Sequence, residues 1–184
     1  FTGNYRFARS GDDLDISPVS GGSNTFYTYP NSDISMPAGW SEFPVSGSLI
    51  AWTKVDEASS DNDTTYIQNN NTTNPVIMGF NYNQAEPAGV ITVTVKVRAK
   101  KTASGGTRNI AGVLRVDGVN YPSSTSSIST SYSLYSFTWA NNPATAAPWT
   151  WAQIKGIAGS GNLQGFGVKA DGNYTDKFPR ITQV

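Results

Sequence analysis

The sequence predicts an all-β fold, an antiparallel β-sandwich or jelly roll with one short helical turn. Three observations lead to this prediction. Short segments alternate between apolar and polar residues, as half-buried strands do. Turn-forming residues separate these segments, and 18 glycines and 10 prolines in 184 residues supply the turns. Residues that favour surface helices are scarce, since only 14% of the chain is charged.

Residues 1–46 are predicted to form an irregular N-terminal arm, and residues 47–184 the jelly-roll β-sandwich domain. Turn clusters recur in the arm, and its apolar residues follow no regular period. Residues 26–29 form either an edge strand or an extended segment on a neighbour. A segment whose aromatic side chains form no core must bury them against another surface, because large exposed apolar patches are unfavourable. We therefore expect several of them to contact the sandwich surface or a neighbouring copy: Phe26, Tyr27, Tyr29, Trp40 and Phe43.

About eight strands are expected in the sandwich domain. They cover residues 49–55, 64–67, 76–80, 91–100, 110–116, 132–139, 165–169 and 178–184. The segment 91–100 has the clearest pattern, because apolar and polar residues alternate over ten positions. Its members Ile91, Val93, Val95 and Val97 are predicted to line the core. A turn at residues 104–106 would then let 110–116 pair with 91–100 as a hairpin.

One helical turn is expected after residue 150. Thr150 and Gln153 have the spacing of a capping box, in which each side chain bonds a backbone N–H of the first turn. Ile154 and Ile157 would share the buried face of this turn. The glycines that follow limit it to one or two turns.

Composition excludes several classes of function. The chain has no cysteine and no histidine, so it lacks the Ser-His-Asp and Cys-His catalytic sets and any Cys/His metal site. Thirteen basic and thirteen acidic residues give zero formal net charge, which is atypical of a nucleic-acid binder. No apolar run approaches the roughly 20 residues of a transmembrane helix. We therefore expect a non-enzymatic protein that binds neither nucleic acid nor membrane.

An acidic cluster follows the segment 49–55. Its carboxylates belong to Asp56, Glu57, Asp61 and Asp63. Calcium takes six to eight oxygen ligands, and closely spaced carboxylates in a loop can supply several of them. The alternative is a solvated turn, since the spacing does not match an EF-hand loop. A glycosidase acid and base would need two carboxylates that face one cleft, and nothing in the sequence marks such a pair. We expect no cofactor, with calcium as the one candidate.

The aromatic residues allow two interpretations. A platform of Trp and Tyr rings, drawn from Trp40, Trp139, Trp149 and Trp151, would bind sugar rings. Alternatively, tryptophans in strands are core residues. We expect the second for Trp52, Trp139 and Trp149. Trp40, which lies beside a Pro-Ala-Gly turn, is expected to be exposed.

A row of basic residues lies on the polar side of segment 91–100 and its end. It comprises Lys96, Arg98, Lys100 and Lys101. Such a row is either a solvated face or a contact with an acidic partner surface, such as a capsid shell.

Four landmarks in their order resemble a known kind of domain. Trp52 and Val55 precede the acidic cluster and residues 63–67, and residues 89–91 lead into the alternating strand. Residues 139–145 are followed by Pro148-Trp149-Thr150, and residues 179–184 close the chain. Over residues 45–184 this order resembles a jelly-roll domain of virion proteins of tailed bacteriophages. Related sandwiches occur in carbohydrate-binding modules.

The resemblance implies a structural protein of a phage particle, in a head-decoration, cement or fibre role. Its partners would be other virion proteins and copies of itself, in a homo-oligomer located in the virion. The alternative is a carbohydrate-binding module or adhesin that recognises a surface glycan outside the cell.

Overall fold

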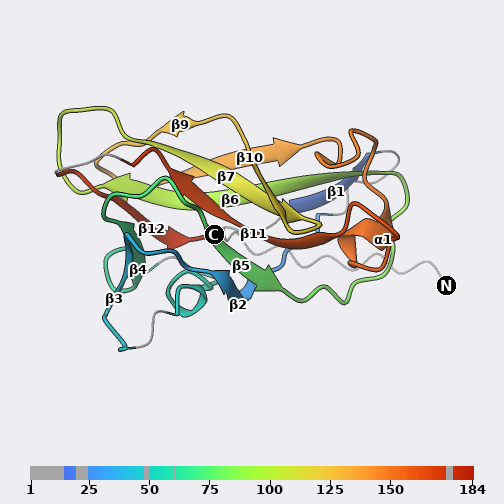
Figure 1. The fold of residues 1–184 in the computed structure, drawn as a ribbon, viewed down its shortest axis with the longest axis horizontal. Coiled ribbons are helices and arrows are strands. Elements are labelled where there is room, and N and C mark those ends of the chain that lie inside the picture. Colours follow the sequence, from blue (N-terminus) through green and yellow to red (C-terminus); the bar gives the residue numbers. More distant parts are fainter. Residues whose placement is uncertain (1–14, 20–24, 48–49, 60, 173–175) are drawn as a thin grey trace.

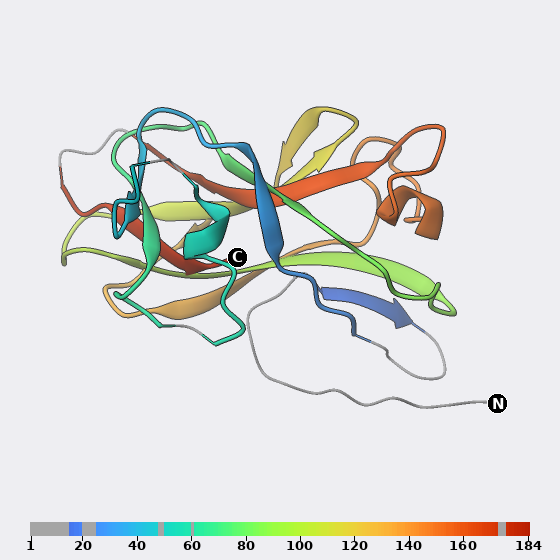
Figure 2. The same ribbon diagram turned by 90° about the horizontal axis from the view of Figure 1, so that it is seen from below.

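Two antiparallel β-sheets packed face to face form the structure, as the sequence predicted (Figures 1 and 2). This computed structural model describes residues 15–19, 25–47, 50–59, 61–172 and 176–184. The described part also contains one 3-10 turn, η1 (Trp52–Lys54), and one short helix, α1 (Trp151–Ile154). In Figure 1 helix α1 lies at one end of the sandwich, and strands β3 and β4 lie at the other.

Each sheet contains six strands. Sheet A is formed by β1 (Asp15–Val19), β3 (Trp40–Phe43), β4 (Tyr66–Asn69), β6 (Val90–Lys101), β10 (Ser133–Trp139) and β12 (Pro179–Gln183). Sheet B is formed by β2 (Pro30–Ser35), β5 (Val76–Phe80), β7 (Asn109–Val116), β8 (Val119–Pro122), β9 (Ser126–Ser127) and β11 (Leu163–Ala170). The order across sheet A is β1-β6-β12-β4-β3, with β10 also on β6. Across sheet B it is β2-β5-β11-β7-β8, with β9 on β7.

Strand β6 is the longest strand and the centre of sheet A. It pairs with β10 over most of its length, with β1 near its start and with β12 near its end. Val93, Val95 and Val97 are fully buried against sheet B, and Ile91 is only 4% exposed. The prediction that these four side chains line the core is confirmed.

A glycine in sheet B allows the two sheets to approach. A Cβ atom at Gly112 of β7 would lie 2.7 Å from Cβ of Phe137, which points inward from β10. Because non-bonded carbon atoms pack at about 3.5 Å or more, Phe137 occupies the space that any side chain at position 112 would need. Gly112 is therefore a packing requirement of the core and not a turn residue.

The predicted hairpin between segments 91–100 and 110–116 is wrong. Both segments are strands, but β6 belongs to sheet A and β7 to sheet B. The connection between them crosses from one sheet to the other. As a result β7 pairs with β11 on one side and with β8 on the other. The tight turn instead joins β7 to β8 at Asp117-Gly118, where both residues have positive φ.

The described part of segment 1–46 is not irregular, contrary to expectation. It contributes β1 and β3 to sheet A and β2 to sheet B. These strands pair with β6, β4 and β5, which all lie after residue 46, so the sheets continue across the expected domain boundary. Deleting residues 1–46 would remove strands from both sheets, so we do not expect residues 47–184 to fold alone. Residues 1–14 lie outside the described residues.

The strand expected at residues 49–55 is also wrong. Residues 52–54 form the 3-10 turn η1 because carboxylates from two strands bind its backbone. Asp33 of β2 accepts hydrogen bonds from the backbone N–H groups of Ala51 and Trp52, at 2.8 and 2.9 Å. Glu42 of β3 accepts from the N–H of Ile50. Donors held in this way are not available to a sheet ladder.

The predicted capping box at residues 150–153 is confirmed. The Thr150 hydroxyl accepts from the backbone N–H of Gln153, and the Gln153 side chain accepts from the N–H of Thr150. The helix ends at Ile154, which is buried. Ile157 is 73% exposed, so the expectation that both isoleucines share a buried face is wrong.

We predict that Gly112→Ala lowers the free energy of unfolding by about 1–3 kcal/mol, because the added methyl group overpacks the core against Phe137. Urea unfolding measures this effect. Gly159→Ala is the matched control, since Gly159 is exposed and has no atom within 4 Å of the added Cβ. Equal stability of the two variants would contradict the account of the sheet interface.

Candidate docking surface

The face of sheet A that points away from the core carries three of the four residues in the basic row expected from the sequence. The fourth, Lys101, has the opposite parity on β6 and donates to the carbonyl oxygens of Gly105 and Gly106. The alternation that buries Val95 and Val97 turns Lys96, Arg98 and Lys100 outward. The strand register extends this face across the sheet. Lys100 lies opposite Arg180 of β12, which in turn lies opposite Gln68 of β4. We call this surface the outer face of sheet A.

Asp63 organises one end of this face. Its carboxylate forms ion pairs with Lys100 and with Arg180, the latter at 3.1 Å. The Tyr132 hydroxyl lies 3.2 Å from the same carboxylate and donates to it. Burial alone would raise the pKa of Asp63, but the hydrogen bonds from Lys100 and Arg180 outweigh it and hold this pKa below its ordinary value. Asp63 is therefore ionised and paired at neutral pH.

Aromatic rings hold the cations of this face in place. The Arg180 guanidinium lies 4.4 Å from the centre of the Tyr66 ring, and Phe43 stacks on the same ring at 5.0 Å. Lys100 lies 4.6 Å from the Tyr132 ring. Each such contact contributes about 0.5–1 kcal/mol at an exposed site. The long basic side chains consequently lie along the sheet in defined positions.

Two cations at the centre of the face have no carboxylate partner among the side chains that the structure describes from residue 25 onward. Lys96 lies 5.1 Å from the Tyr27 ring. Arg98 lies 5.8 Å from the Tyr132 ring and donates to the Asn62 side-chain oxygen. Neither forms an ion pair with an Asp or Glu of that part of the chain. The side chain of Asp15, whose backbone pairs with Thr94 of β6, lies outside this description.

The structure divides the acidic cluster into two parts. Asp63 belongs to the outer face, whereas Glu57 and Asp61 turn toward Thr65. The Thr65 hydroxyl lies 2.5 Å from Glu57 Oε1 and 2.8 Å from Asp61 Oδ2. A hydroxyl has one proton to donate, so it cannot fully satisfy both carboxyl groups. Burial raises the pKa of Glu57, and the charges of Asp61 and Asp56 raise it further, against the lowering effect of the hydrogen bond from Thr65.

This second part of the cluster also fastens the end of the chain. The Gln183 amide donates to the Glu57 carbonyl oxygen at 2.6 Å, and the Thr182 hydroxyl donates to Asp61 Oδ1 at 3.2 Å. Glu57 Oε2 is buried and has no hydrogen-bond partner in the structure. An unpaired carboxyl oxygen in such a place is tolerated far better on a neutral acid than on an anion.

The aromatic residues expected to contact a partner have different environments. Tyr27 lies on the outer face beneath Lys96, and Phe43 is on the same face and 45% exposed. Phe26 packs against the core, edge-on to Tyr82, and Tyr29 is half-buried. Trp40 was expected to be exposed, and this was wrong. It is 4% exposed, because its indole N–H donates to the carbonyl oxygen of Asn74 at 2.9 Å inside the sandwich.

The other tryptophans are core residues or lie against the core. Trp149 and Trp151 are buried, and Trp52 and Trp139 are half-buried against the core cluster. The described tryptophans therefore form no exposed platform for sugar rings. The basic row of β6 was visible in the sequence, whereas Arg180, which comes from the distant strand β12, was not predicted to join it. Its signal was the alternation within residues 179–184, which turns Arg180 to the side opposite the buried Ile181.

Comparison with family models, curated proteins and solved structures finds no match to this chain. Neither helix of the described part is long and apolar enough to cross a membrane. The function proposed for this chain therefore rests on the geometry of its own residues.

We predict that Glu57→Gln changes how stability depends on pH. A carboxyl group with a raised pKa stabilises the fold fully below its ordinary pKa of about 4.3, and this contribution is lost as pH rises through the raised value. A glutamine at position 57 keeps the shape of the side chain but does not titrate. The melting temperature of the variant, compared with wild type, should therefore rise as the pH increases above about 4. Glu86→Gln, at an exposed position, is the control. An equal pH profile for Glu57→Gln and wild type would contradict the raised pKa of Glu57.

Calcium binding at the acidic cluster stays a hypothesis that a melt can test. Among the described residues no three Asp or Glu side chains converge closely enough to hold a metal ion, and Asp63 is already paired with Lys100 and Arg180. We predict that the melting temperature is the same with calcium and with a chelator. A loss of several degrees on chelation would establish a calcium site instead.

Proposed function

We propose that this chain is a non-enzymatic structural module that docks on an acidic partner surface through the outer face of sheet A. The observation that supports this proposal most strongly is that Lys96 and Arg98, on the outer face of sheet A, form no ion pair with any carboxylate described from residue 25 onward. Leu134, Ser136 and Thr138 of β10 extend the face beside them and are exposed.

The basic side chains on this face are held in fixed positions, which favours a role in binding a partner over a role in solubility alone. Exposed lysine and arginine side chains ordinarily lose rotamer freedom when a partner binds. Here Tyr27, Tyr66 and Tyr132 already hold the basic groups before any partner arrives. Pre-organised cations of this kind lose less entropy on meeting an acidic surface, and they steer its approach.

The setting we propose is the particle of a tailed bacteriophage, as the resemblance of residues 45–184 implies. The partners would be other virion proteins and copies of the same chain. A second copy of the chain is one candidate partner, since equal numbers of acidic and basic residues leave carboxylates elsewhere on the chain.

The alternative is recognition of a surface glycan. The outer face does not favour it, because cations lie over its tyrosine rings and leave less ring area for sugar stacking.

The docking proposal predicts that Lys96→Gln/Arg98→Gln weakens binding to an acidic polypeptide by about tenfold or more, since each change removes a charge-assisted contact. Immobilised poly-glutamate at low ionic strength is the probe, and native mass measurement of the same variant reports self-association. Arg115→Gln/Lys169→Gln removes one arginine and one lysine from sheet B and serves as control. Equal losses in both double variants would show that only net charge matters and would overturn the proposal.

A further inference from the structure

Strand β10 forms an open edge of sheet A (Figure 1). It covers one side of β6 from Val93 to Ala99, while β1 and β12 share the opposite side. Within the described part of the chain, the β10 backbone forms one hydrogen bond to a residue outside β6, in which the Trp149 indole N–H donates to the Trp139 carbonyl oxygen. Over residues 133–138 the other edge therefore presents backbone N–H and C=O groups that no described strand pairs. We call this the free edge of β10.

The five other edge strands that the structure describes are each protected against pairing with another chain. Strands β1, β2 and β8 contain proline, which cannot donate a ladder hydrogen bond. Strand β3 has four residues and carries Glu42, and β9 has only two residues. Short length, charge and proline are common means of keeping a sheet edge from pairing. Strand β10 has none of them, since its seven residues include no proline and no charged side chain and pair with β6 without a register shift.

We propose that the free edge of β10 pairs with the same edge of a second copy, antiparallel and around a two-fold axis at Ser136. An axis perpendicular to the sheet keeps the outward side chains of both copies on one face. It places Leu134 opposite Thr138 of the second copy and Tyr135 opposite Phe137 of the second copy. The two A sheets join into one continuous sheet, and because each β10 has one free edge, the assembly closes at two copies.

The side chains of β10 suit this self-pairing on both faces of the sheet. On the core side Phe137 is buried, and Tyr135 packs against the core cluster. The pairing brings each of these rings next to the other ring of the second copy, and cross-strand aromatic pairs stabilise a sheet. On the outward side Leu134 is 45% exposed, and its contact with Thr138 of the second copy covers an apolar side chain.

The charges on the outer face of sheet A do not oppose this pairing. Lys96 and Arg98 lie on β6, where they pair with Ser136 and Leu134 of their own chain. The β6 strands of two paired copies are separated by three strand spacings, or about 14 Å. This separation exceeds the Debye length of about 8 Å at physiological ionic strength, so salt screens the repulsion between the two basic rows. The dimer thus carries both rows on one side of a single sheet.

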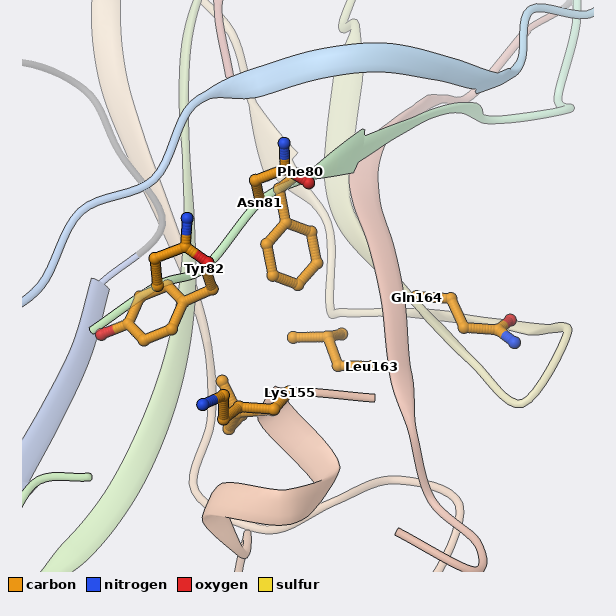
Figure 3. A pocket seen from close by; sticks show the side chains of 8 residues that line it. Phe80, Asn81, Tyr82, Lys155, Leu163 and Gln164 are labelled. Atoms are coloured by element: carbon orange, nitrogen blue, oxygen red, sulfur yellow. The ribbon is translucent and has the colours of Figure 1, made fainter. Parts of the chain in front are cut away.

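The hollow beside helix α1 offers a second copy no comparable contact (Figure 3). The Phe80 and Tyr82 rings that line it pack on Phe166 and Trp151, and the hollow exposes little apolar surface. The self-complementary edge of β10, and not this hollow, is the contact that a second copy fits.

The test is the mass of the full chain in solution, measured by sedimentation equilibrium over a range of concentrations. Two paired strands of seven residues form an interface smaller than the roughly 1,200 Å² of a standard one, so we expect a dissociation constant in the micromolar range. The wild-type chain should shift from the 19.7 kDa monomer to twice that mass as its concentration rises from about 1 to about 100 μM.

Two double variants test the proposed register. Leu134→Glu/Thr138→Glu sets like charges opposite each other in two cross-strand pairs of the dimer and should weaken dimerisation by about tenfold or more. Leu134→Glu/Thr138→Lys is the matched control, because it sets opposite charges in the same two pairs and should restore dimerisation. In both variants the new carboxylate at the first position lies opposite Arg98 of its own chain, and circular dichroism checks that each variant is folded.

The proposal fails if the wild-type chain stays monomeric, if both double variants dimerise as tightly as wild type, or if the control dimerises as weakly as Leu134→Glu/Thr138→Glu. The docking variant Lys96→Gln/Arg98→Gln leaves β10 unchanged and should dimerise like wild type. Loss of its dimer would assign self-association to the outer face of sheet A and overturn the pairing. Binding of poly-glutamate is measured separately, so the docking proposal and this one can fail independently.

Discussion

The alternation of strand β6 is the constraint on which the rest of the structure depends. One set of its side chains, Val93, Val95 and Val97, is completely buried between the sheets. The other set, which includes Lys96 and Arg98, faces outward on the same strand. A shift of one residue in register would exchange the two sets and bury the charges. The core and the candidate docking surface are therefore two consequences of a single pattern.

Long-range polar contacts then complete the surface that the pattern begins. Asp63 comes from the loop before β4, yet it joins Lys100 of β6 to Arg180 of β12 across the sheet. The Tyr132 ring contacts Lys100, and the Tyr66 ring contacts Arg180. The acidic cluster thus helps to position the cations of the face, while its other half, around Glu57, fastens the last strand to the sandwich.

Local signals in the sequence were sufficient for part of this fold. The strands at 76–80, 91–100 and 110–116 and the Thr150–Gln153 capping box depend on neighbouring residues, and the structure agrees with them. The hairpin was wrong because no local signal says that the connection after β6 crosses to the other sheet. The turn at 52–54 and the burial of Trp40 depend on distant partners, Asp33 and Asn74. The basic row was visible as a periodic pattern, whereas its pairing with Asp63 was not.

Thiol labelling tests most directly whether β6 separates the core from the outer face of sheet A. The natural chain has no cysteine, so single cysteines can be placed along β6 and labelled with a maleimide in dilute solution. Cysteines that replace Thr92 or Lys96 should react like exposed thiols. Those that replace Val93 or Val95 should react only as fast as the protein opens. Labelling rates without this alternation, or slow reaction at positions 92 and 96 in the monomer, would contradict the account.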